Sequence, residues 1–312
     1  MKRNYLPKES KFIVIGGGLF GCSIAYFLAK RGKEVILLER GNICSGASGR
    51  NGGQVIQLEG RDKNPETIKR RLELTKENNS ILKNLSKELH IELEYKETGS
   101  LDVAFTDEEW KELKEAVEIQ KKVGDKEIML LDREETLEVC PVLTENIKGA
   151  RYRPSDGTIN PFFYTYGFAK HLKTLGGDFF THTKVVKILR EKEKVKGVEI
   201  EGGKRLKAEK VINATNTWSS FLIPEIDILP LRQIGVVTEP IAPLPVCPVE
   251  AIIGGDAIYT NIQPGSGNLL AGGLKTLPKG REGQYDERVY LDEVGEAPQF
   301  LLISILHCRT YP

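Results

Sequence analysis

Cysteine, histidine and net charge are all scarce in this sequence. The five cysteines among 312 residues form no C-x-x-C pair and the four histidines do not cluster, so neither a metal site nor dithiol redox chemistry is indicated. Lysine plus arginine, 45, nearly equals aspartate plus glutamate, 44, so no net field attracts nucleic acid or an anionic membrane. We therefore expect a small-molecule ligand, no metal, no nucleic acid and a reducing, cytoplasmic location.

One uncharged stretch, Phe12 to Ala29, follows a basic N-terminus and resembles a signal peptide or a membrane helix. Its internal pattern favours another interpretation. Residues 11–15 are rich in β-branched side chains and predict a strand, a glycine turn follows, and residues 19–32 predict a helix that ends at Gly32. A second strand at 33–39 follows at once, so the sequence predicts a β-α-β unit, with the membrane segment as the alternative.

The glycine turn in this unit has the spacing G-x-G-x-x-G, formed by Gly16, Gly18 and Gly21. Such glycines allow a tight turn, close approach to a pyrophosphate and close packing of helix on strand, while the helix N-terminus attracts the anion. Glu39 closes the second strand, where an acid can accept hydrogen bonds from ribose hydroxyls. The unit predicts dinucleotide binding; a glycine-rich structural turn is the alternative.

The sequence has no second G-x-G-x-x-G, which a flavoprotein reductase using NAD(P)H would need. Instead, the second strand runs into a glycine-rich stretch, Ser45 to Val55. Backbone amides freed by its glycines can line a long cofactor, its serines can donate to phosphate, and Arg50 adds a cation. Taken alone, the stretch would also fit a flexible surface loop.

Several segments resemble the FAD-dependent D-amino acid oxidase family, nearest its glycine and sarcosine oxidase and D-amino acid dehydrogenase branches. These segments are IVIGGGLFGCSIAYFLAKRGKEVILLE, SGASGRNGGQV, GARYRPSDGTINPFFYTYGFAKHLKTLGG, THTKVVKIL, KVINATNTWSS, PLRQIGVVTEP and IYTNIQPGSGNLLAGG. They follow one another in the order typical of the family and cover about Lys11 to Gly273. In KVINATNTWSS, Asn216 and Thr217 stand where relatives commonly have glycine or alanine.

The resemblance implies non-covalently bound FAD and a set of residues that contact it. The implied cofactor-binding residues are Gly16, Gly18, Leu19, Phe20, Gly21, Glu39, Arg40, Ser45, Gly46, Ala47, Ser48, Arg50, Asn51, Gly52, Gly53, Gln54, Val185, Ala214, Thr215 and Trp218. Gln54 and Tyr259 match positions on the substrate side of the flavin and are the candidate catalytic residues. Packing is the alternative role of Tyr259.

The resemblance also implies an α/β fold: a Rossmann-like FAD/NAD(P)-binding domain with a second, mixed-sheet α+β substrate domain. We expect the FAD domain at residues 1–90 and 146–222, the substrate domain at 91–145 and 223–295, and an atypical tail at 296–312. Helical periodicity predicts helices at 64–90 and 106–124, the second opened by a capping box of Thr106 and Glu109. The apolar residues near helical spacing in the first are Ile68, Leu72, Leu74, Ile81, Leu82, Leu85 and Leu89. Beyond about Glu296 the family's R-P-x-T-x-D-G-x-P run is not found, so we expect the C-terminal part of the FAD domain to be missing.

The function implied is oxidation of a C–N bond by hydride transfer to flavin. The substrate would be a small amine or amino acid: glycine, sarcosine, a D-amino acid or a proline-like imino acid. Oxygen or an electron-accepting partner subunit would take the electrons, and a hetero-oligomer is possible. The alternatives are an inactive or structural flavoprotein subunit of a larger amine dehydrogenase and an NAD(P)H-dependent flavoprotein reductase.

Overall fold

The computed structural model describes residues 5–274 except 59, 60, 62, 229–232, 242–247, 254 and 255. The chain divides into two compact units. Unit 1 consists of Met1–Asn51, Lys87–Glu92 and Pro161–Pro230, and unit 2 consists of Gly52–Ser86, Leu93–Asn160 and Leu231–Pro312. These units are defined by packing alone, and the functional domain boundaries given above stay predictions.

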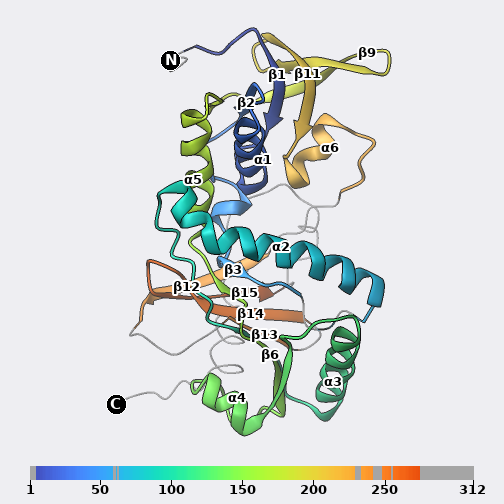
Figure 1. The fold of residues 1–312 in the computed structure, drawn as a ribbon, viewed down its shortest axis with the longest axis vertical. Coiled ribbons are helices and arrows are strands. Elements are labelled where there is room, and N and C mark those ends of the chain that lie inside the picture. The colour runs from blue at the N-terminus through green and yellow to red at the C-terminus, as the bar shows by residue number, and fades with distance from the viewer. Residues whose placement is uncertain are drawn as a thin grey trace. The chain divides into compact units, whose positions relative to one another are not determined.

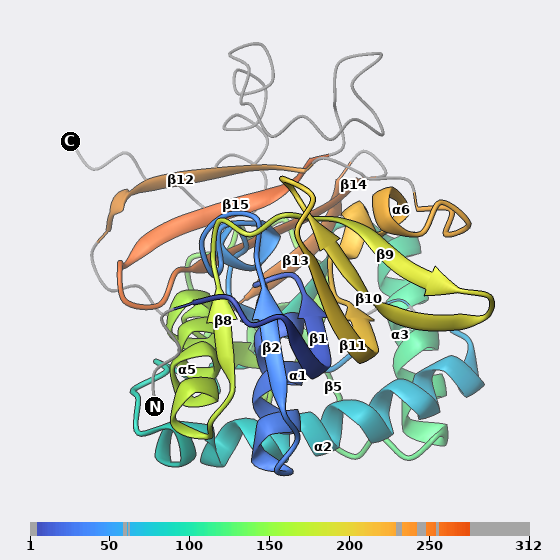
Figure 2. The same cartoon turned by 90° about the horizontal axis from the view of Figure 1, so that it is seen from above.

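Unit 1 is built on a six-stranded sheet with the order β8-β2-β1-β11-β10-β9, whose strands can be followed side by side in Figure 2. The strands β8, β2, β1 and β11 run parallel. From β11 the sheet continues through β10 to β9 with antiparallel pairs. The strands are β1 (Glu9–Ile15), β2 (Val35–Leu38), β8 (Asp178–Phe180), β9 (Val185–Glu191), β10 (Lys194–Ile200) and β11 (Arg205–Asn213). All four side chains of β2 are buried, as expected for a central strand of a parallel sheet.

The helices of unit 1 begin with α1 (Leu19–Lys30), which packs against α5 (Pro161–Thr174) through contacts of Tyr26 and Phe27 with Phe168. The remaining short helices are η1 (Ala47–Gly49), η2 (Asn216–Trp218) and α6 (Ser219–Leu222). The predicted β-α-β unit is thus present, and the uncharged stretch from Phe12 to Ala29 is divided between β1 and α1. No helix in the described part of the chain is both long and apolar enough to span a membrane.

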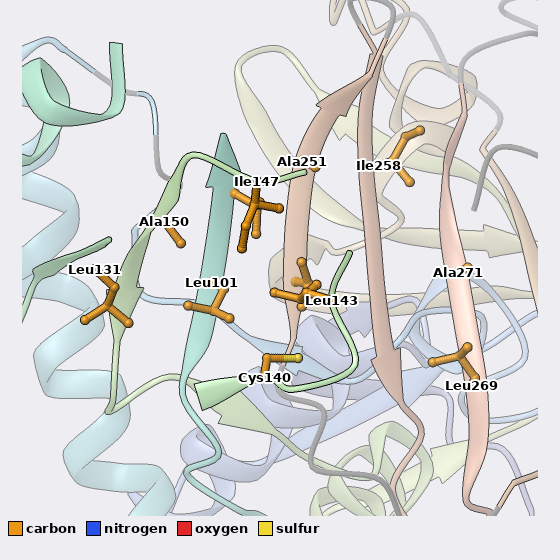
Figure 3. Close-up of a cluster of buried hydrophobic side chains, with 12 residues drawn as sticks. Leu101, Leu131, Cys140, Leu143, Ile147, Ala150, Ala251, Ile258, Leu269 and Ala271 are labelled. Atoms are coloured by element: carbon orange, nitrogen blue, oxygen red, sulfur yellow. The ribbon is translucent and has the colours of Figure 1, made fainter. Parts of the chain in front are cut away.

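Unit 2 contains a seven-stranded sheet with the order β12-β15-β14-β13-β4-β6-β5, and a two-stranded sheet of β3 and β7. The strands are β3 (Gln54–Val55), β4 (Ser100–Ala104), β5 (Met129–Asp132), β6 (Gly149–Arg153), β7 (Gly157–Thr158), β12 (Ile234–Pro240), β13 (Val249–Ile253), β14 (Asp256–Ile262) and β15 (Asn268–Leu274). One face of the larger sheet carries a hydrophobic core that includes Leu101, Ala251 and Ile258 (Figure 3). β13 pairs parallel with β4, and the other pairs are antiparallel, which makes this a mixed sheet.

Three further helices, labelled in Figure 1, are α2 (Pro65–Leu89), α3 (Asp107–Lys122) and α4 (Arg133–Val139). Both long helices occur where the apolar periodicity predicts them, and Thr106 and Glu109 form the expected capping box. Two of the residues that periodicity assigns to the apolar stripe of α2 lie outside it: Leu74 is 62% exposed and Ile81 39% exposed. The buried stripe consists of Ile68, Leu72, Leu82, Leu85 and Leu89, of which Ile68 and Leu72 pack against Leu58.

Candidate functional site

Three parallel strands of unit 1 end at the same edge of the sheet. Ile15, the last residue of β1, pairs with Leu38 at the end of β2 and with Asn213 at the end of β11. The next residues along the chain are Gly16, Glu39 and Ala214, so the glycine turn, the acid and the A-T-N-T-W segment meet at one edge. Ligands of open α/β sheets bind outside the carboxyl ends of the strands.

The glycine turn is as crowded as the spacing predicts. Gly16 has φ +109°, and a Cβ there would lie 2.7 Å from the Ala214 carbonyl oxygen. A Cβ on Gly21 would lie 1.8 Å from the Gly16 carbonyl oxygen, so only glycine lets α1 approach the end of β1 this closely. A Cβ on Gly18 would lie 2.8 Å from Ser48 Oγ.

The N-terminus of α1 presents backbone N–H groups in a favourable setting for an anion. Its N-cap is Gly18, which has no side chain to cap the helix, and its first turn holds no acidic residue. The Leu19 N–H donates to Ser48 Oγ at 2.9 Å, which brings the second glycine segment to this helix end. Phe20, in the same turn, is largely exposed. The partial positive charge of a helix N-terminus favours phosphate here.

Glu39 is fixed by the backbone around it. Its Oε2 accepts a hydrogen bond from the Gly17 N–H at 2.5 Å, and its Oε1 accepts one from the Gly41 N–H at 2.7 Å. A carboxylate has about four acceptor sites, so two hydrogen bonds leave capacity for ribose hydroxyls. The side chain is thus held in place before any ligand binds, which lowers the entropic cost of using it.

Replacing Glu39 by alanine should weaken FAD binding by about ten- to a hundredfold, because hydrogen bonds to a charged group contribute about 1.5–3 kcal/mol. The dissociation constant is measured by titrating flavin-free protein with FAD. Glu34→Ala is the matched control, because it removes an exposed acid at the opposite end of β2. Equal affinities of Glu39→Ala and wild type would contradict the assigned role.

Most of the glycine-rich segment belongs to unit 1. Gly46 precedes η1, Ala47 and Ser48 lie in it, and the Asn51 side chain donates to the carbonyl oxygens of Ala47 at 3.0 Å and Ser48 at 2.7 Å. A Cβ on Gly46 would meet no atom within 4 Å. The segment is therefore an ordered turn with its own hydrogen bonds. Ser45 and Arg50 are exposed on the same turn.

The remaining cofactor-binding candidates of unit 1 surround Glu39. The guanidinium carbon of Arg40 lies 4.4 Å from the ring centroid of Trp218, a cation–π distance. The Thr183 N–H donates to the Glu39 carbonyl oxygen at 2.7 Å, so the turn before Val185 lies against the end of β2. Thr215 donates through its N–H and its hydroxyl to Asn213 Oδ1.

The backbone conformation of Asn216 explains why asparagine can stand where relatives commonly have glycine or alanine. Its φ of +51° lies in the left-handed region, where glycine has no penalty and asparagine is tolerated better than most other residues. The substitution therefore keeps the turn that follows β11.

The last four residues of the glycine-rich segment, Gly52 to Val55, lie in unit 2. There Asn261, on β14, donates through Nδ2 to the Gly52 carbonyl oxygen at 2.8 Å, and its Oδ1 accepts a hydrogen bond from Gln54 Nε2 at 3.1 Å. The Asn261 side chain is fully buried. The contact of Asn261 with Gln54 could not be predicted from the sequence, since the two residues are about two hundred residues apart along the chain.

Tyr259, the other candidate catalytic residue, lies on the same strand as Asn261. Because side chains alternate along a strand, Tyr259 and Asn261 point to one face of the sheet, with their Cα atoms about 7 Å apart. Ile258 and Thr260 are buried on the opposite face. Burial raises the pKa of the Tyr259 hydroxyl, so it is a neutral phenol that can donate a hydrogen bond at physiological pH.

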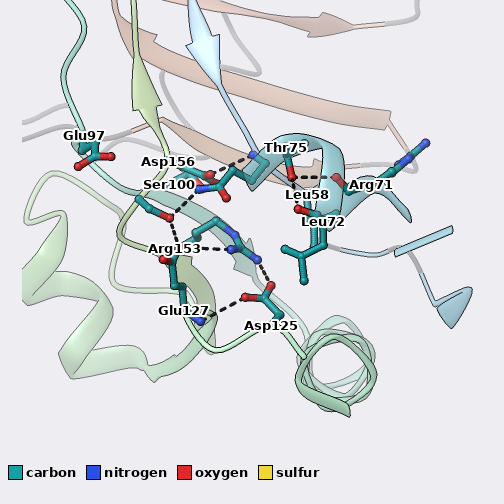
Figure 4. Close-up of polar contacts among 12 residues, drawn as sticks. Leu58, Arg71, Leu72, Thr75, Glu97, Ser100, Asp125, Glu127, Arg153 and Asp156 are labelled. Carbon is teal, nitrogen blue, oxygen red and sulfur yellow. Dashed lines mark hydrogen bonds and ion pairs between the residues drawn. The ribbon is translucent and has the colours of Figure 1, made fainter. Parts of the chain in front are cut away.

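A buried charged network contacts the segment that follows β3 (Figure 4). Asp156 Oδ1 accepts from the Gln57 N–H at 2.9 Å, and its Oδ2 accepts from Ser100 Oγ at 2.7 Å. Arg151 Nη2 donates to the Leu58 carbonyl oxygen at 2.6 Å, and Arg153 pairs with Asp125. Nothing in the sequence marks these arginines as buried.

Arg232, Cys308 and Arg309 lie outside the described residues. Among the described residues, no cluster of three or more histidine, cysteine, aspartate or glutamate side chains could hold a metal ion.

Comparisons with known proteins give one family. The sequence profile described as DAO, FAD dependent oxidoreductase, matches residues 11–299. The chain is 34% identical over 175 residues to a glycerol 3-phosphate dehydrogenase from Caloramator mitchellensis, covering 56% of this chain and 35% of that protein. It is 26% identical over 232 residues to a glycine oxidase from Bacillus subtilis strain 168, covering 73% and 58%. An L-proline dehydrogenase structure from P. horikoshii has a TM-score of 0.79 at 29% identity, covering 95% of this chain and 76% of that one.

The chain thus spans 35% and 58% of the lengths of those two curated relatives.

Proposed function

Because the chain belongs to the DAO family of FAD-dependent oxidoreductases, we propose that it oxidises a C–N bond of a small amine or amino acid. The relatives named as a glycine oxidase and an L-proline dehydrogenase support this substrate class. The observation that carries the proposal is the edge of the unit 1 sheet where Gly16, Glu39 and Ala214 meet beside the N-terminus of α1, whose N-cap is Gly18.

The residues at this edge fit FAD. The N-terminal turn of α1 would hold the pyrophosphate: the N-cap Gly18 offers no capping side chain, and the Leu19 N–H already donates to Ser48 Oγ. Glu39, with unused acceptor capacity, would bind ribose hydroxyls. The open space beside Gly46 leaves room for a ligand along the second glycine segment.

FAD, when bound, supplies the hydride acceptor for oxidation of an amine to an imine. The residues of this chain have to bind and orient the substrate and keep its nitrogen unprotonated. In unit 2, Tyr259 provides a neutral hydroxyl that can donate to a substrate oxygen, and Gln54 provides a side-chain amide. Neither residue is required as a nucleophile. Oxygen or a partner protein would accept the electrons afterwards.

The glycerol 3-phosphate dehydrogenase relative favours a second candidate, oxidation of a C–O bond. One experiment separates the candidates. The FAD-loaded chain is mixed anaerobically with glycine, sarcosine, D-alanine, L-proline, glycerol 3-phosphate or NADH, each alone, and the flavin absorbance is followed. Free FAD without protein is the control for direct reduction.

Bleaching of the bound flavin by at least one amine is the expected result. Bleaching by glycerol 3-phosphate alone would replace the proposal with alcohol oxidation, and bleaching by NADH alone would indicate a reductase. If FAD is bound but nothing bleaches it, the chain is a non-catalytic flavoprotein and the proposal is wrong.

A further inference from the structure

The orientation of the Asn261 side-chain amide is determined by its partners. Asn261 Nδ2 donates to two backbone carbonyl oxygens, those of Gly52 at 2.8 Å and Ile262 at 3.1 Å. Carbonyl oxygens only accept hydrogen bonds, so the group that faces them must be the NH2 group. Asn261 Oδ1 is therefore the acceptor end, and it faces Gln54.

This orientation in turn fixes Gln54. An acceptor on Asn261 requires a donor on Gln54, and Gln54 Nε2 fills that role at 3.1 Å. The Gln54 carbonyl oxygen, Oε1, is then the other end of the planar amide and points away from Asn261. No described residue donates to Oε1, and the Gln54 side chain is only partly buried. The glutamine thus presents an unused hydrogen-bond acceptor.

Backbone contacts hold the rest of Gln54 rigidly. β3 pairs antiparallel with β7, with Gln54 opposite Thr158. The Ile159 N–H donates to the Gly53 carbonyl oxygen at 2.8 Å, directly before Gln54. A side chain on a fixed strand, bonded at its tip to a buried asparagine, has little rotamer freedom left to lose when a ligand binds.

A second unused polar group points to the same ligand. The Tyr259 hydroxyl has no hydrogen-bond partner among the described residues, although the tyrosine is partly buried. It lies over Gly272, where a Cβ would be 2.7 Å from the hydroxyl oxygen. This face of β14 therefore offers Tyr259 as a donor, with Asn261 two residues on holding an acceptor in place. An amine carries N–H donors, and an amino acid adds carboxylate acceptors.

We infer that Asn261 is a positioning residue that holds Gln54 so that Gln54 Oε1 accepts a hydrogen bond from the substrate amine. The inference rests on the proposed function and adds the atom that recognises the nitrogen. Without Asn261, Gln54 can rotate and present either end of its amide. A misplaced NH2 group would face the N–H donors of the amine and repel them.

The test compares Gln54→Leu, Asn261→Ala, the double variant and wild type, all loaded with FAD. Two dissociation constants are measured from the change in flavin absorbance: one for the best amine of the substrate panel, and one for the carboxylate of matching size that lacks the amine. Thr260→Val is the matched control. It removes a buried hydrogen bond, from Thr260 Oγ1 to the Leu270 carbonyl oxygen at 2.9 Å, from the opposite face of the same strand.

Gln54→Leu should weaken amine binding by about ten- to a hundredfold, as for other unpaired polar groups in a binding site, and leave the carboxylate without an amine unaffected. Asn261→Ala should show the same selectivity, and the double variant should be no weaker than the weaker single variant. Thr260→Val should match wild type for both ligands. Because Gln54 is only partly buried, replacing it should disturb folding little, so Gln54→Leu is the decisive variant if Asn261→Ala does not fold.

Gln54→Glu tests the contact with the amine through the pH dependence of flavin reduction, which should not change if Gln54 has only a structural role. A carboxylate beside the amine stabilises the ammonium form of the substrate and raises the pKa of the bound amine. Because hydride leaves only from the neutral amine, the pH dependence of anaerobic flavin reduction should shift to higher pH.

The inference is overturned if Gln54→Leu and Asn261→Ala bind the amine as wild type does, or if they lose amine and carboxylate equally. It also fails if no amine reduces wild-type flavin, since the proposed function then fails first. The two failures are distinguishable because the second is already visible in wild type.

Discussion

Gly21→Ala should weaken FAD binding by at least about thirtyfold, because overpacking of this kind costs about 2 kcal/mol or more. A Cβ on Gly21 would lie 1.8 Å from the Gly16 carbonyl oxygen, and that oxygen belongs to the turn itself. α1 must then move away from the end of β1, and its N-terminal N–H groups move with it. The measurement is the flavin absorbance that the protein retains after gel filtration in the absence of free FAD.

Gly235→Ala is the control for Gly21→Ala. Gly235 is exposed on β12, and the nearest atom to its added Cβ is the Ala271 carbonyl oxygen at 3.7 Å, an ordinary contact. The control should keep the wild-type flavin content. If Gly21→Ala also keeps it while remaining folded, the close packing of α1 on β1 does not serve the cofactor.

Asp156→Ala should lower the free energy of unfolding by about 3–5 kcal/mol, the range found when one partner of a buried charged pair is removed. The Gln57 N–H and the Ser100 hydroxyl lose their acceptor, and Arg151 and Arg153, which are 2% and 0% exposed, lose a buried counter-charge. Chemical denaturation of wild type and variant, analysed by linear extrapolation, measures the difference.

Asp156→Asn separates charge from hydrogen bonding. Asparagine keeps the size of the side chain and one acceptor oxygen, so its loss should be smaller than that of Asp156→Ala. An Asp156→Ala variant as stable as wild type would mean that water or a rearranged side chain replaces the carboxylate, and the network would not hold the segment after β3.

The local part of this structure is predictable from the sequence because its determinants are close together. Gly16, Gly18 and Gly21 lie within one turn and Glu39 closes the next strand, so spacing alone places them. The start of α3 is predicted by a capping box whose partners, Thr106 and Glu109, are three residues apart.

The long-range part is not predictable in this way. Asn261 reaches Gly52 and Gln54 only because β14 takes its place in the sheet of unit 2, and no periodicity encodes that register. Arg151 and Arg153 would be taken for surface residues on composition alone, since charged side chains are rarely buried without partners. Their surroundings become visible only in the folded chain, where Asp102 lies opposite Arg151 in the pairing of β4 with β6 and Arg153 pairs with Asp125.

On α2, the apolar periodicity predicts too many buried residues, because Leu74 and Ile81 are exposed. Helical spacing counts every apolar residue near the stripe, whereas burial depends on the width of the surface that α2 covers. On α2, that surface covers Ile68, Leu72, Leu82, Leu85 and Leu89 and leaves Leu74 and Ile81 in solvent.

The most direct test of the account is a titration of the flavin-free, 312-residue chain with FAD, followed by flavin absorbance and by the heat of binding. The account predicts saturable, equimolar binding that Glu39→Ala weakens and Glu34→Ala leaves unchanged. A folded chain that takes up no FAD, or takes it up equally well with Glu39 replaced, would contradict the assignment of the α1 N-terminus and Glu39 as the cofactor site.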